Sequence, residues 1–256
     1  MFRIATWNVN SLRVRLAHVT AWLETSEPEV LAIQETKTID ENFPVSEFEQ
    51  MGYYSTYAGQ KTYNGVAILS KKPANLVAKE FPDFVDPQRR ILCVTIDDIC
   101  ILNLYVPNGS EVGSEKYAYK LEWLSHLQSF TESILQKYQR CIITGDFNIA
   151  PTDEDVHDPE AWAGKVLCSE PEREAFFKLT GQGLEDCFRL FERGEKIFSW
   201  WDYRAAGFRR NRGLRIDHIL ASRPLAARCT ACEIDVAPRK LERPSDHAPV
   251  YCDFDI

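Results

Sequence analysis

Short apolar segments rich in Val, Ile, Thr and aromatic residues recur along the whole chain, and this repetition constrains the fold more than any other feature. Segments of this length and composition are typical of buried β-strands. They lie at about residues 2–8, 29–34, 53–58, 65–70, 91–97, 99–106, 140–146, 197–200, 214–221, 229–236 and 248–254. Helical periodicity occurs near 12–25, 115–139 and 171–181. Two sheets packed together would bury this much β structure. We therefore predict a mixed or antiparallel α/β sandwich with its helices outside.

The segments between these elements show no linker that would divide the chain. No low-complexity stretch, Gly/Ser linker or short repeat interrupts the sequence, so we expect residues 1–256 to form a single domain. The loops long enough to carry function are 38–50, 107–114, 151–170 and 202–213. No run of about eighteen apolar residues is present, so we expect no membrane span. The N-terminus resembles a strand rather than a signal peptide, which favours a cytoplasmic protein.

Eight cysteines raise the question of disulfides or a zinc site. Cys93, Cys100, Cys141 and Cys252 lie within apolar segments, where a thiol packs as a small hydrophobic group. Only the segment 229–232, Cys-Thr-Ala-Cys, has the spacing of metal ligands, and no second pair accompanies it. Because a zinc site needs about four ligands, we predict that all eight cysteines are structural and reduced.

The net charge of −8 argues against nucleic acid as a partner, because binding to phosphates requires lysine and arginine. The distribution of charge is uneven, however. Residues 204–243 contain ten basic and four acidic side chains, a local charge of +6. Such a segment can present a cationic face to a polyanion. An ordinary solvated surface explains the same charges equally well.

Polar clusters follow the apolar segments abruptly. They are Asn8-Val9-Asn10, Gln34-Glu35-Thr36, Tyr105-Val106-Pro107-Asn108, Asp146-Phe147-Asn148, Asp217-His218 and Ser245-Asp246-His247. Each residue taken alone is more often a cap or a turn former. Their repetition at successive strand ends indicates an active site gathered by a rigid sheet. Asn8 and Asn10 are two residues apart, as are Asp146 and Asn148, so in extended backbone each pair would point to one side.

His247 is the best candidate for a catalytic histidine, because the prolines around it indicate a loop from which it can turn into a pocket. His218 should face away from Asp217 if both lie in one strand. We expect the carboxylate of Asp217 to bond to the second ring nitrogen of His247 and to stabilise its protonated form. Glu35, with help from Asn8 and Asp246, offers oxygen ligands that suit Mg²⁺, or Mn²⁺ as a substitute, better than zinc.

Taken together, these blocks resemble the exonuclease III family of bacterial DNA repair nucleases, within the endonuclease/exonuclease/phosphatase superfamily. The similarity extends nearly from end to end and includes residues 7–13, 31–37, 63–67, 88–90, 145–153 and 244–250. The blocks Ser-Trp-Trp-Asp-Tyr-Arg at 199–204 and Arg-Gly-Leu-Arg-Ile-Asp at 212–217 are more specific to the abasic-site nucleases. The resemblance implies an α/β (α+β) fold, a four-layer sandwich of two packed mixed β-sheets flanked by helices.

The resemblance also implies a reaction and a substrate. The reaction is metal-assisted attack of water on phosphodiester bonds of double-stranded DNA. It would give 3′-to-5′ exodeoxyribonuclease activity, incision 5′ to abasic sites and removal of 3′ blocking phosphates. The partner would be DNA with abasic sites or 3′ ends, with Mg²⁺ or Mn²⁺ as the cofactor. We expect a monomer with no obligate protein partner and no association with membranes.

Catalytic roles follow from the resemblance position by position. The implied metal ligands are Glu35 as the principal one, with Asn8 and Asp246 close by. Asp146 would orient or deprotonate the attacking water, and Asn148 would bind a phosphate oxygen. His247, paired with Asp217, would stabilise charge on the phosphoryl group or act as the base. Tyr105 would lie on the leaving-group or phosphate side.

Contacts to DNA follow in the same way. The implied DNA- or phosphate-binding positions are Asn10, Arg90, Asn108, Lys116, Trp200, Arg212, Leu214 and Ile216. Among them Trp200, Leu214 and Ile216 would line a pocket for a flipped-out abasic sugar, which costs less to extrude than a paired base. The segment 151–170 varies in the family, which leaves open the balance between exonuclease, 3′-phosphatase and abasic endonuclease activities.

Two other functions remain to be weighed. Superfamily phosphatases and phosphodiesterases that act on inositol phosphates, sphingomyelin or RNA share the catalytic blocks, but they lack the blocks at 199–204 and 212–217. A DNA-binding or scaffold protein with an inactive site would show a lesion at one of the catalytic positions, and the sequence shows none.

Overall fold

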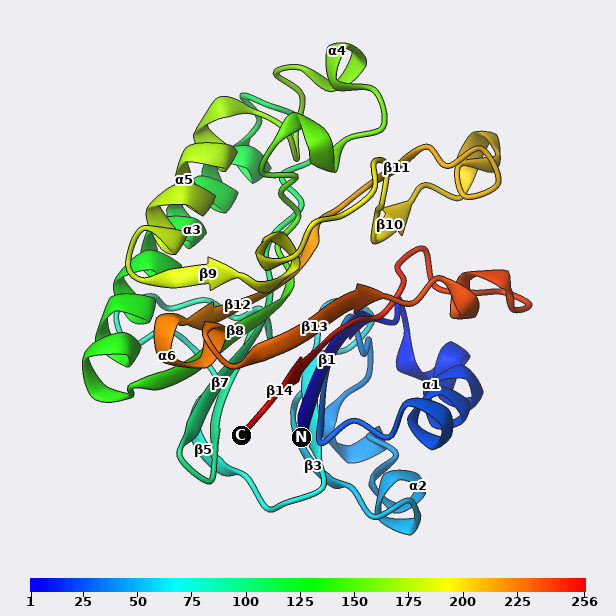
Figure 1. Ribbon diagram of the computed structural model, residues 1–256, viewed down its shortest axis with the longest axis vertical. Coiled ribbons are helices and arrows are strands. Elements are labelled where there is room, and N and C mark those ends of the chain that lie inside the picture. The colour runs from blue at the N-terminus through cyan, green and yellow to red at the C-terminus, as the bar shows by residue number, and fades with distance from the viewer.

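Two six-stranded β-sheets lie face to face, and helices cover their outer faces (Figure 1). The computed structural model describes residues 1–256. The first sheet consists, in order, of β13 (Cys229–Ile234), β14 (Val250–Phe254), β1 (Phe2–Asn8), β2 (Val30–Gln34), β4 (Val66–Ser70) and β3 (Tyr54–Ala58). The second consists of β5 (Asn75–Ala78), β6 (Ile91–Ile96), β7 (Ile99–Tyr105), β8 (Arg140–Asp146), β12 (Asp217–Ser222) and β9 (Leu184–Asp186).

Each sheet contains one parallel pair of strands, and a long helix connects the two strands of that pair. In the first sheet β1 and β2 are parallel and are joined by α1 (Leu12–Ser26). In the second sheet β7 and β8 are parallel and are joined by α3 (Glu115–Lys137). All other neighbouring strands are antiparallel. Both sheets are therefore mixed, and the predicted four-layer sandwich is confirmed.

Side chains along the central strands alternate between a core that lies between the sheets and cores that lie under the helices. In β1, Ile4 packs between the sheets, whereas Trp7 packs with residues of α1 and of α2 (Val45–Gln50). In β7, Ile101 packs between the sheets, whereas Leu102 packs with residues of α3 and of α5 (Glu170–Thr180). This period of two explains why these strands are apolar throughout, since both of their faces are buried.

A buried pair of amide side chains joins the two sheets. Gln34, at the end of β2, donates from Nε2 to Oδ1 of Asn103 in β7 at 2.7 Å and to Oγ1 of Thr6 at 2.8 Å. Asn103 donates in turn to the carbonyl oxygens of Ile33 and Ala67 at 3.0 and 2.8 Å. Hydrogen bonds in an apolar interior have narrow geometry and are costly to lose. They therefore fix the position of one sheet against the other.

The predicted strands at 197–200 and 214–221 are wrong in their bounds. A separate two-stranded ribbon, β10 (Trp200–Trp201) and β11 (Gly213–Leu214), projects beyond the two sheets, and β12 starts only at Asp217 (Figure 1). The interruption falls at Arg215. Its buried guanidinium donates to Asp155 and Asp186 at 2.6 and 2.8 Å, which draws the chain away from the sheet.

Other differences concern short elements. The edge strand β5 and the short strand β9 were not predicted, because β5 is mostly exposed and β9 spans only three residues. The predicted loops contain α2, α4 (Pro159–Trp162) and several turns of 3₁₀ helix. The remaining elements are η1 (Asp40–Asn42), η2 (Asp153–Asp155), η3 (Cys187–Leu190), η4 (Arg204–Ala206), α6 (Arg223–Ala226) and η5 (Ala237–Lys240). None of the helices is both long enough and apolar enough to cross a membrane.

Candidate active site

The ends of strands from both sheets meet at one edge of the sandwich. Asn8 is the last residue of β1, and Asp146 is the last residue of β8. Asp217, the first residue of β12, lies directly opposite Asp146 in the register of the second sheet. All three side chains are buried. The site is therefore assembled from both sheets, as the polar clusters at successive strand ends predicted.

Asn8 links the carboxylates of the two sheets. Its Nδ2 atom donates to Oε1 of Glu35 and to Oδ2 of Asp146, both at 2.9 Å. Its Oδ1 atom accepts from the backbone N–H of Asn10 at 3.0 Å. A single amide group thus holds Glu35, which follows β2, close to Asp146 at the end of β8.

The prediction that extended backbone points Asn8 and Asn10, and likewise Asp146 and Asn148, to one side is wrong. The backbone leaves the extended conformation at the second residue of each pair, since φ is 45° at Asn10 and 49° at Asn148. Glu35 also has a positive φ of 53°, a region that costs free energy for residues other than glycine. Sharp turns at the strand ends, rather than extended backbone, bring these side chains to the site.

Gly145 allows β8 to place Asp146 correctly. Its φ is 143°, and a Cβ atom at this position would lie 1.9 Å from the carbonyl oxygen of Leu104 in β7. Any other residue would push the two strands apart immediately before the catalytic candidate. Glycine at this position therefore follows from the close approach of β8 to β7.

His247 lies between two buried carboxylates. Its Nδ1 atom is 2.9 Å from Oδ2 and 3.1 Å from Oδ1 of Asp217, so it donates to this carboxylate. Its Nε2 atom is 3.7 Å from Oδ2 of Asp146. The contact between Asp217 and His247 is the one that the sequence predicted. His218 turns away, as expected, and its Nε2 atom lies 2.9 Å from the carbonyl oxygen of Ile149.

Burial and charge shift the pKa values of this group. Burial would lower the pKa of His247, but the carboxylates of Asp217 and Asp146 outweigh it and raise that pKa to about 10. Burial raises the pKa of Asp146 to about 7, against the opposing effect of the charge on His247. Near neutral pH the imidazole is therefore a cation, and the carboxyl group of Asp146 is poised to take up a proton.

Asp246 connects the last loop to the projecting ribbon. Its Oδ2 atom accepts from Nε1 of Trp200 at 3.0 Å, and its Oδ1 atom accepts from Nδ2 of Asn10 at 2.9 Å. Burial alone would raise the pKa of Asp246, but the charge on His247 and these hydrogen bonds lower it. Asp246 is therefore ionised and fixed in place. Trp200 also lies opposite His247 in an isolated β-bridge, so the ribbon is joined directly to the catalytic loop.

The opposite side of the site contains Tyr105 and Asn148. Burial, together with the charges of Glu35 and Asp146, raises the pKa of Tyr105 well above its ordinary value, so its hydroxyl keeps its proton. The guanidinium of Arg90 lies 4.6 Å from the centre of the Tyr105 ring. Asn148 donates to the carbonyl oxygen of Val106 at 3.0 Å, and its Oδ1 atom accepts from Asn108 at 3.1 Å.

An apolar cluster borders the site on the side of the ribbon. Leu214 and Ile216 are buried in it, and Trp200 packs against it while remaining partly exposed. Trp200 and Leu214 pair directly between β10 and β11. The three residues predicted to line an abasic-sugar pocket therefore lie together.

Two predicted phosphate-binding residues lie outside this network. Lys116 is an exposed residue in the first turn of α3, and Arg212 is exposed in the turn before β11. The side chains of both are without a hydrogen bond or ion pair to the rest of the chain. Their geometry leaves both side chains accessible to a large ligand.

Three basic residues that the sequence analysis did not single out support the site. Lys37 contacts Oε2 of Glu35 at 2.8 Å and Oδ1 of Asn10 at 2.6 Å. Arg15 of α1 donates to the carbonyl oxygens of Asn10 and Pro244, which ties two catalytic loops together. Lys120 of α3, fully buried, donates to the carbonyl oxygen of Asn148 at 2.7 Å. Of the three, only Lys37 could be linked to the site from the sequence, because it lies two residues after Glu35.

The donor atoms of this site fit a hard divalent cation. Carboxylate oxygens of Asp146 and Asp217 lie within 4.8 Å of each other and of a ring nitrogen of His247. The imidazole is protonated and bonded to Asp217, so the donors left for a metal ion are carboxylate oxygens. Glu35 and Asp246 add further carboxylates close by. Oxygen-rich sets of this kind are typical of sites for metals such as Mg²⁺ and Mn²⁺.

Comparison with known proteins agrees with the fold and with the family that the sequence resembles. The model of the endonuclease/exonuclease/phosphatase family matches residues 5–247. The chain is 38% identical to exodeoxyribonuclease III of Haemophilus influenzae, over 98% of this chain and 99% of that protein. It is 31% identical to an exodeoxyribonuclease of Bacillus subtilis, over 97% of each chain.

Solved structures show the same relationship. A Neisseria 3′ phosphatase, NExo, bound to a product DNA hairpin is 42% identical, with a TM-score of 0.98 and full coverage of both chains. An AP endonuclease from Archaeoglobus fulgidus is 38% identical, with a TM-score of 0.96 and full coverage. The chain therefore belongs to the endonuclease/exonuclease/phosphatase family, in its exonuclease III branch, and the resemblance inferred from the sequence is confirmed.

Proposed function

We propose that this protein is a DNA repair nuclease that hydrolyses the bond between phosphorus and O3′ in duplex DNA. Three activities follow from this one reaction: 3′-to-5′ exonuclease, removal of 3′ blocking phosphates, and incision 5′ to abasic sites. The observation that supports the proposal best is the group of Asp146, Asp217 and His247 held between two sheets at one edge. The relatives in the exonuclease III branch support the same reaction.

Asp146 is the residue that we assign to the attacking water. Its carboxyl group is buried, and its pKa of about 7 suits a proton acceptor near neutral pH. Asn8 and the backbone N–H of Asn148 donate to its two oxygens, both at 2.9 Å, and hold it in one orientation. The water donates its proton to Asp146 as its oxygen forms the new bond to phosphorus.

The charge that develops on the phosphoryl group is stabilised by the groups around it. His247 is a buried cation at neutral pH, and its Nε2 atom points toward the region of Asp146. Tyr105 keeps its hydroxyl proton, so it can donate to phosphate or to the departing O3′ oxygen. The Nδ2 atom of Asn148 donates to Val106 and Asp146 in the protein alone, so it must turn from one of them to donate to phosphate. Preorganised donors in a water-poor site are typically the largest contribution to catalysis. In this assignment His247 stabilises charge and does not act as the base.

Glu35, Asn8 and Asp246 are the residues that we propose for the divalent cation, Mg²⁺ with Mn²⁺ as a substitute. Such an ion supplies electrostatic stabilisation of the phosphoryl oxygens and of the leaving group. The ammonium group of Lys37 lies 2.8 Å from Glu35, so a cation already accompanies this carboxylate in the protein alone.

The substrate that we propose is DNA with a 3′ end or an abasic site. Trp200 is partly exposed and packs on the buried Leu214 and Ile216, so its indole offers an apolar surface beside the catalytic carboxylates, suited to a sugar without its base. Exposed cations flank the site on both sides. The turn after β10 carries four exposed arginines, Arg204, Arg209, Arg210 and Arg212. On the other side a groove of about 800 Å³ contains Arg13, Lys37 and Lys61. These two groups favour contact with the phosphates of a duplex.

The direct test is incubation with a duplex that carries one abasic analogue, in Mg²⁺ and in chelator. We expect incision 5′ to the lesion and resection from 3′ ends in Mg²⁺ alone. The absence of both reactions in every condition would overturn the proposal. A duplex with a 3′ phosphate, assayed in parallel, gives the balance of the three activities. The single-domain organisation of residues 1–256, the cytoplasmic location and the monomeric state stay predictions.

A further inference from the structure

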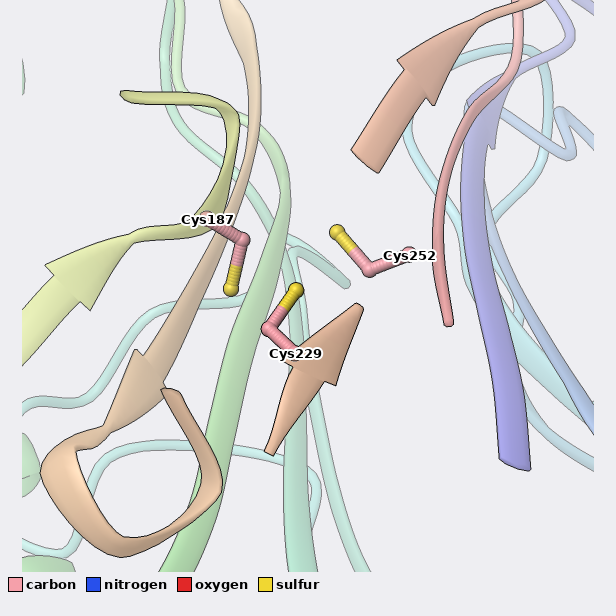
Figure 2. Close-up of side chains that lie close together, drawn as sticks. All are labelled: Cys187, Cys229 and Cys252. Carbon is pink, nitrogen blue, oxygen red and sulfur yellow. The ribbon is translucent and has the colours of Figure 1, made fainter. Parts of the chain in front are cut away.

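Three cysteine sulfur atoms from distant parts of the sequence converge away from the strand ends of the active site, and a fourth cysteine lies beside them. The sulfur atoms of Cys187, Cys229 and Cys252 lie within 4.8 Å of one another (Figure 2). Cys232 lies directly opposite Cys252 in the pairing of β13 with β14. Cys187, Cys232 and Cys252 are completely buried, and Cys229 is partly exposed. We refer to these four residues as the thiol cluster.

A β-bulge in β13 brings two of these cysteines to the same face of the strand. Cys229 and Cys232 are three residues apart, so in a regular strand they would point to opposite faces. The register shifts between Cys229 and Ala231, which places one extra residue in β13 against β14. The bulge therefore turns Cys229 toward the core that contains Cys232 and Cys252. The bulge therefore places both sulfur donors of the Cys-Thr-Ala-Cys segment on the same face of β13.

The other two members of the cluster supply the second pair of donors that the sequence alone did not reveal. Cys252 lies in β14 of the first sheet, and Cys187 begins η3, which follows β9 of the second sheet. The cluster therefore spans the interface between the sheets. A zinc site with sulfur ligands needs about four donors arranged as a tetrahedron.

We propose that the thiol cluster is a binding site for Zn²⁺, or for another thiophilic divalent cation, separate from the catalytic site. Only sulfur atoms converge here, and soft thiolate sets select zinc over magnesium. With sulfur at about 2.3 Å from zinc, tetrahedral ligands lie about 3.8 Å from each other, which is compatible with three sulfur atoms that lie within 4.8 Å of one another and with Cys232 moving in as the fourth ligand. The partly exposed Cys229 gives an ion access to the cluster. Each thiol that binds the ion releases its proton to solvent.

The electrostatics of the cluster agree with this geometry. Hydrogen bonds from the thiols of Cys187 and Cys252 lower the pKa of Cys229 well below its ordinary value. The buried thiols would release their protons to solvent as they bind the metal.

A second group of cysteines provides the matched comparison. Cys93, Cys100 and Cys141 lie on the neighbouring strands β6, β7 and β8 and pack under α3 and α5. The sulfur atoms of Cys93 and Cys100 are 3.6 Å apart. The three residues form a row across the sheet rather than a group around one point, so they do not form a cage for an ion. Cys100→Ser is therefore a control that matches Cys187→Ser in burial and in chemistry.

An ion bound to the thiol cluster would constrain a long segment of the chain. Cys187 and Cys229 bracket residues 188–228, the segment that carries the β10–β11 ribbon with Trp200 and Leu214. An ion bound to both cysteines would join the two ends of this segment. Cross-links that close long segments remove conformational freedom from the unfolded chain. Zinc bound here would therefore stabilise the protein without taking part in the reaction.

The test uses Co²⁺ as a spectroscopic probe. The reduced, metal-free full chain is titrated with Co²⁺ under argon, and Zn²⁺ is then added. We expect a thiolate-to-cobalt charge-transfer band that saturates at one ion per chain and disappears when Zn²⁺ displaces the cobalt. The catalytic site has no sulfur, so cobalt bound there gives no such band. Cys229→Ser and Cys187→Ser should lose the band, and Cys100→Ser should retain it.

Three outcomes would overturn the proposal. One is the absence of a charge-transfer band in the wild-type chain at saturating Co²⁺. Another is an unchanged band in Cys229→Ser, whose folding is checked by circular dichroism. The third is a mass lower by two hydrogen atoms with no bound metal after purification without reductant, because this would identify a disulfide in the cluster. Cys229 is partly exposed, so its variant should fold even if Cys187→Ser does not. Nuclease activity in Mg²⁺ is a separate measurement, and its absence would leave these results unaffected.

Discussion

The catalytic group and the thiol cluster are both buried, and both are assembled from the two sheets, yet they are held together in different ways. In the catalytic group, His247 contacts the carboxylates of Asp146 and Asp217 as an opposite charge, and Asn8 satisfies a further carboxylate oxygen. Buried charges need such partners, because an unpaired one is very costly. Thiols need none, because a neutral cysteine packs as a small hydrophobic group.

This difference decides which group a sequence reveals. Charged residues interrupt the apolar strands that carry them, so each member of the catalytic group stands out. Cysteine fits an apolar strand without interruption, so the thiol cluster becomes visible only in three dimensions. Perturbing each group in turn should therefore affect different properties: turnover for the first and stability for the second.

The largest effect on turnover is expected from Asp146→Asn. The variant keeps the size of the side chain but cannot accept the proton of the water, so we expect kcat to fall by about 10² or more. Affinity for the DNA substrate should change little. Steady-state kinetics and a binding titration separate the two quantities. Asp253→Asn, a buried carboxylate that pairs with Arg3 at 2.7 Å, is the control and should retain its kcat. A loss confined to affinity would reassign Asp146 to binding.

The next effect is expected from Asp217→Asn. Removal of this charge should lower the pKa of His247 from about 10, because the carboxylate is the strongest influence that raises it. Turnover needs Asp146 without its proton and His247 with it. The wild-type rate should therefore rise as pH passes about 7 and fall as it approaches about 10. In the variant the falling limb should move to lower pH, with a loss of about 10² in kcat at neutral pH. NMR titration of the imidazole checks the pKa, and an unshifted value would remove Asp217 from this role.

A smaller and selective effect is expected from Trp200→Ala. Loss of the indole removes an apolar contact and the hydrogen bond to Asp246, so we expect about a tenfold fall in abasic-site incision. Removal of a 3′ phosphate should fall less, because it does not require an extruded sugar. Trp200→Phe keeps the ring and loses only the hydrogen bond, so it separates the two contributions. Equal losses in both reactions would remove Trp200 from a substrate pocket.

Substitutions in the thiol cluster are expected to have the smallest effect on turnover and the clearest effect on stability. Zn²⁺ at about a hundred times its dissociation constant should stabilise the wild type by about 2.7 kcal/mol. Cys229→Ser should lose this increment, whereas Cys100→Ser should keep it. Denaturant titration with and without Zn²⁺ measures the difference. A change of kcat in Cys229→Ser as large as in Asp217→Asn would contradict the separation of the two groups.

Most of the fold could be predicted, because strands buried on both faces leave an unmistakable apolar pattern. The predicted segments at 2–8 and 140–146 match β1 and β8. The prediction of strands failed where a strand is exposed and so lacks the apolar pattern of a buried one, as at the edge strand β5. It also failed at Arg215, where a buried ion pair ends a strand that the apolar residues around it appeared to continue.

The residues of the candidate site could be predicted from the sequence, but most of the contacts and backbone turns that hold them could not. The contact of Asp217 with His247 followed from chemistry alone, since a catalytic histidine needs a carboxylate on its second nitrogen. The turns at Asn10 and Asn148 did not, because a positive φ at a residue other than glycine depends on surrounding contacts. Lys120 could not be found either, because its role depends on α3 lying over the turn at Asn148.

The buried amides of Gln34 and Asn103 have a consequence for how this chain can change over time. The two sheets carry different parts of the active site, and these amides meet between them at 2.7 Å. Replacement of either one removes a hydrogen-bond partner from the other in the core, at a cost of about 1–3 kcal/mol. Apolar neighbours such as Ile4 and Ile101 can be exchanged for residues of similar size one at a time. Positions 34 and 103 should instead change together or not at all among related chains.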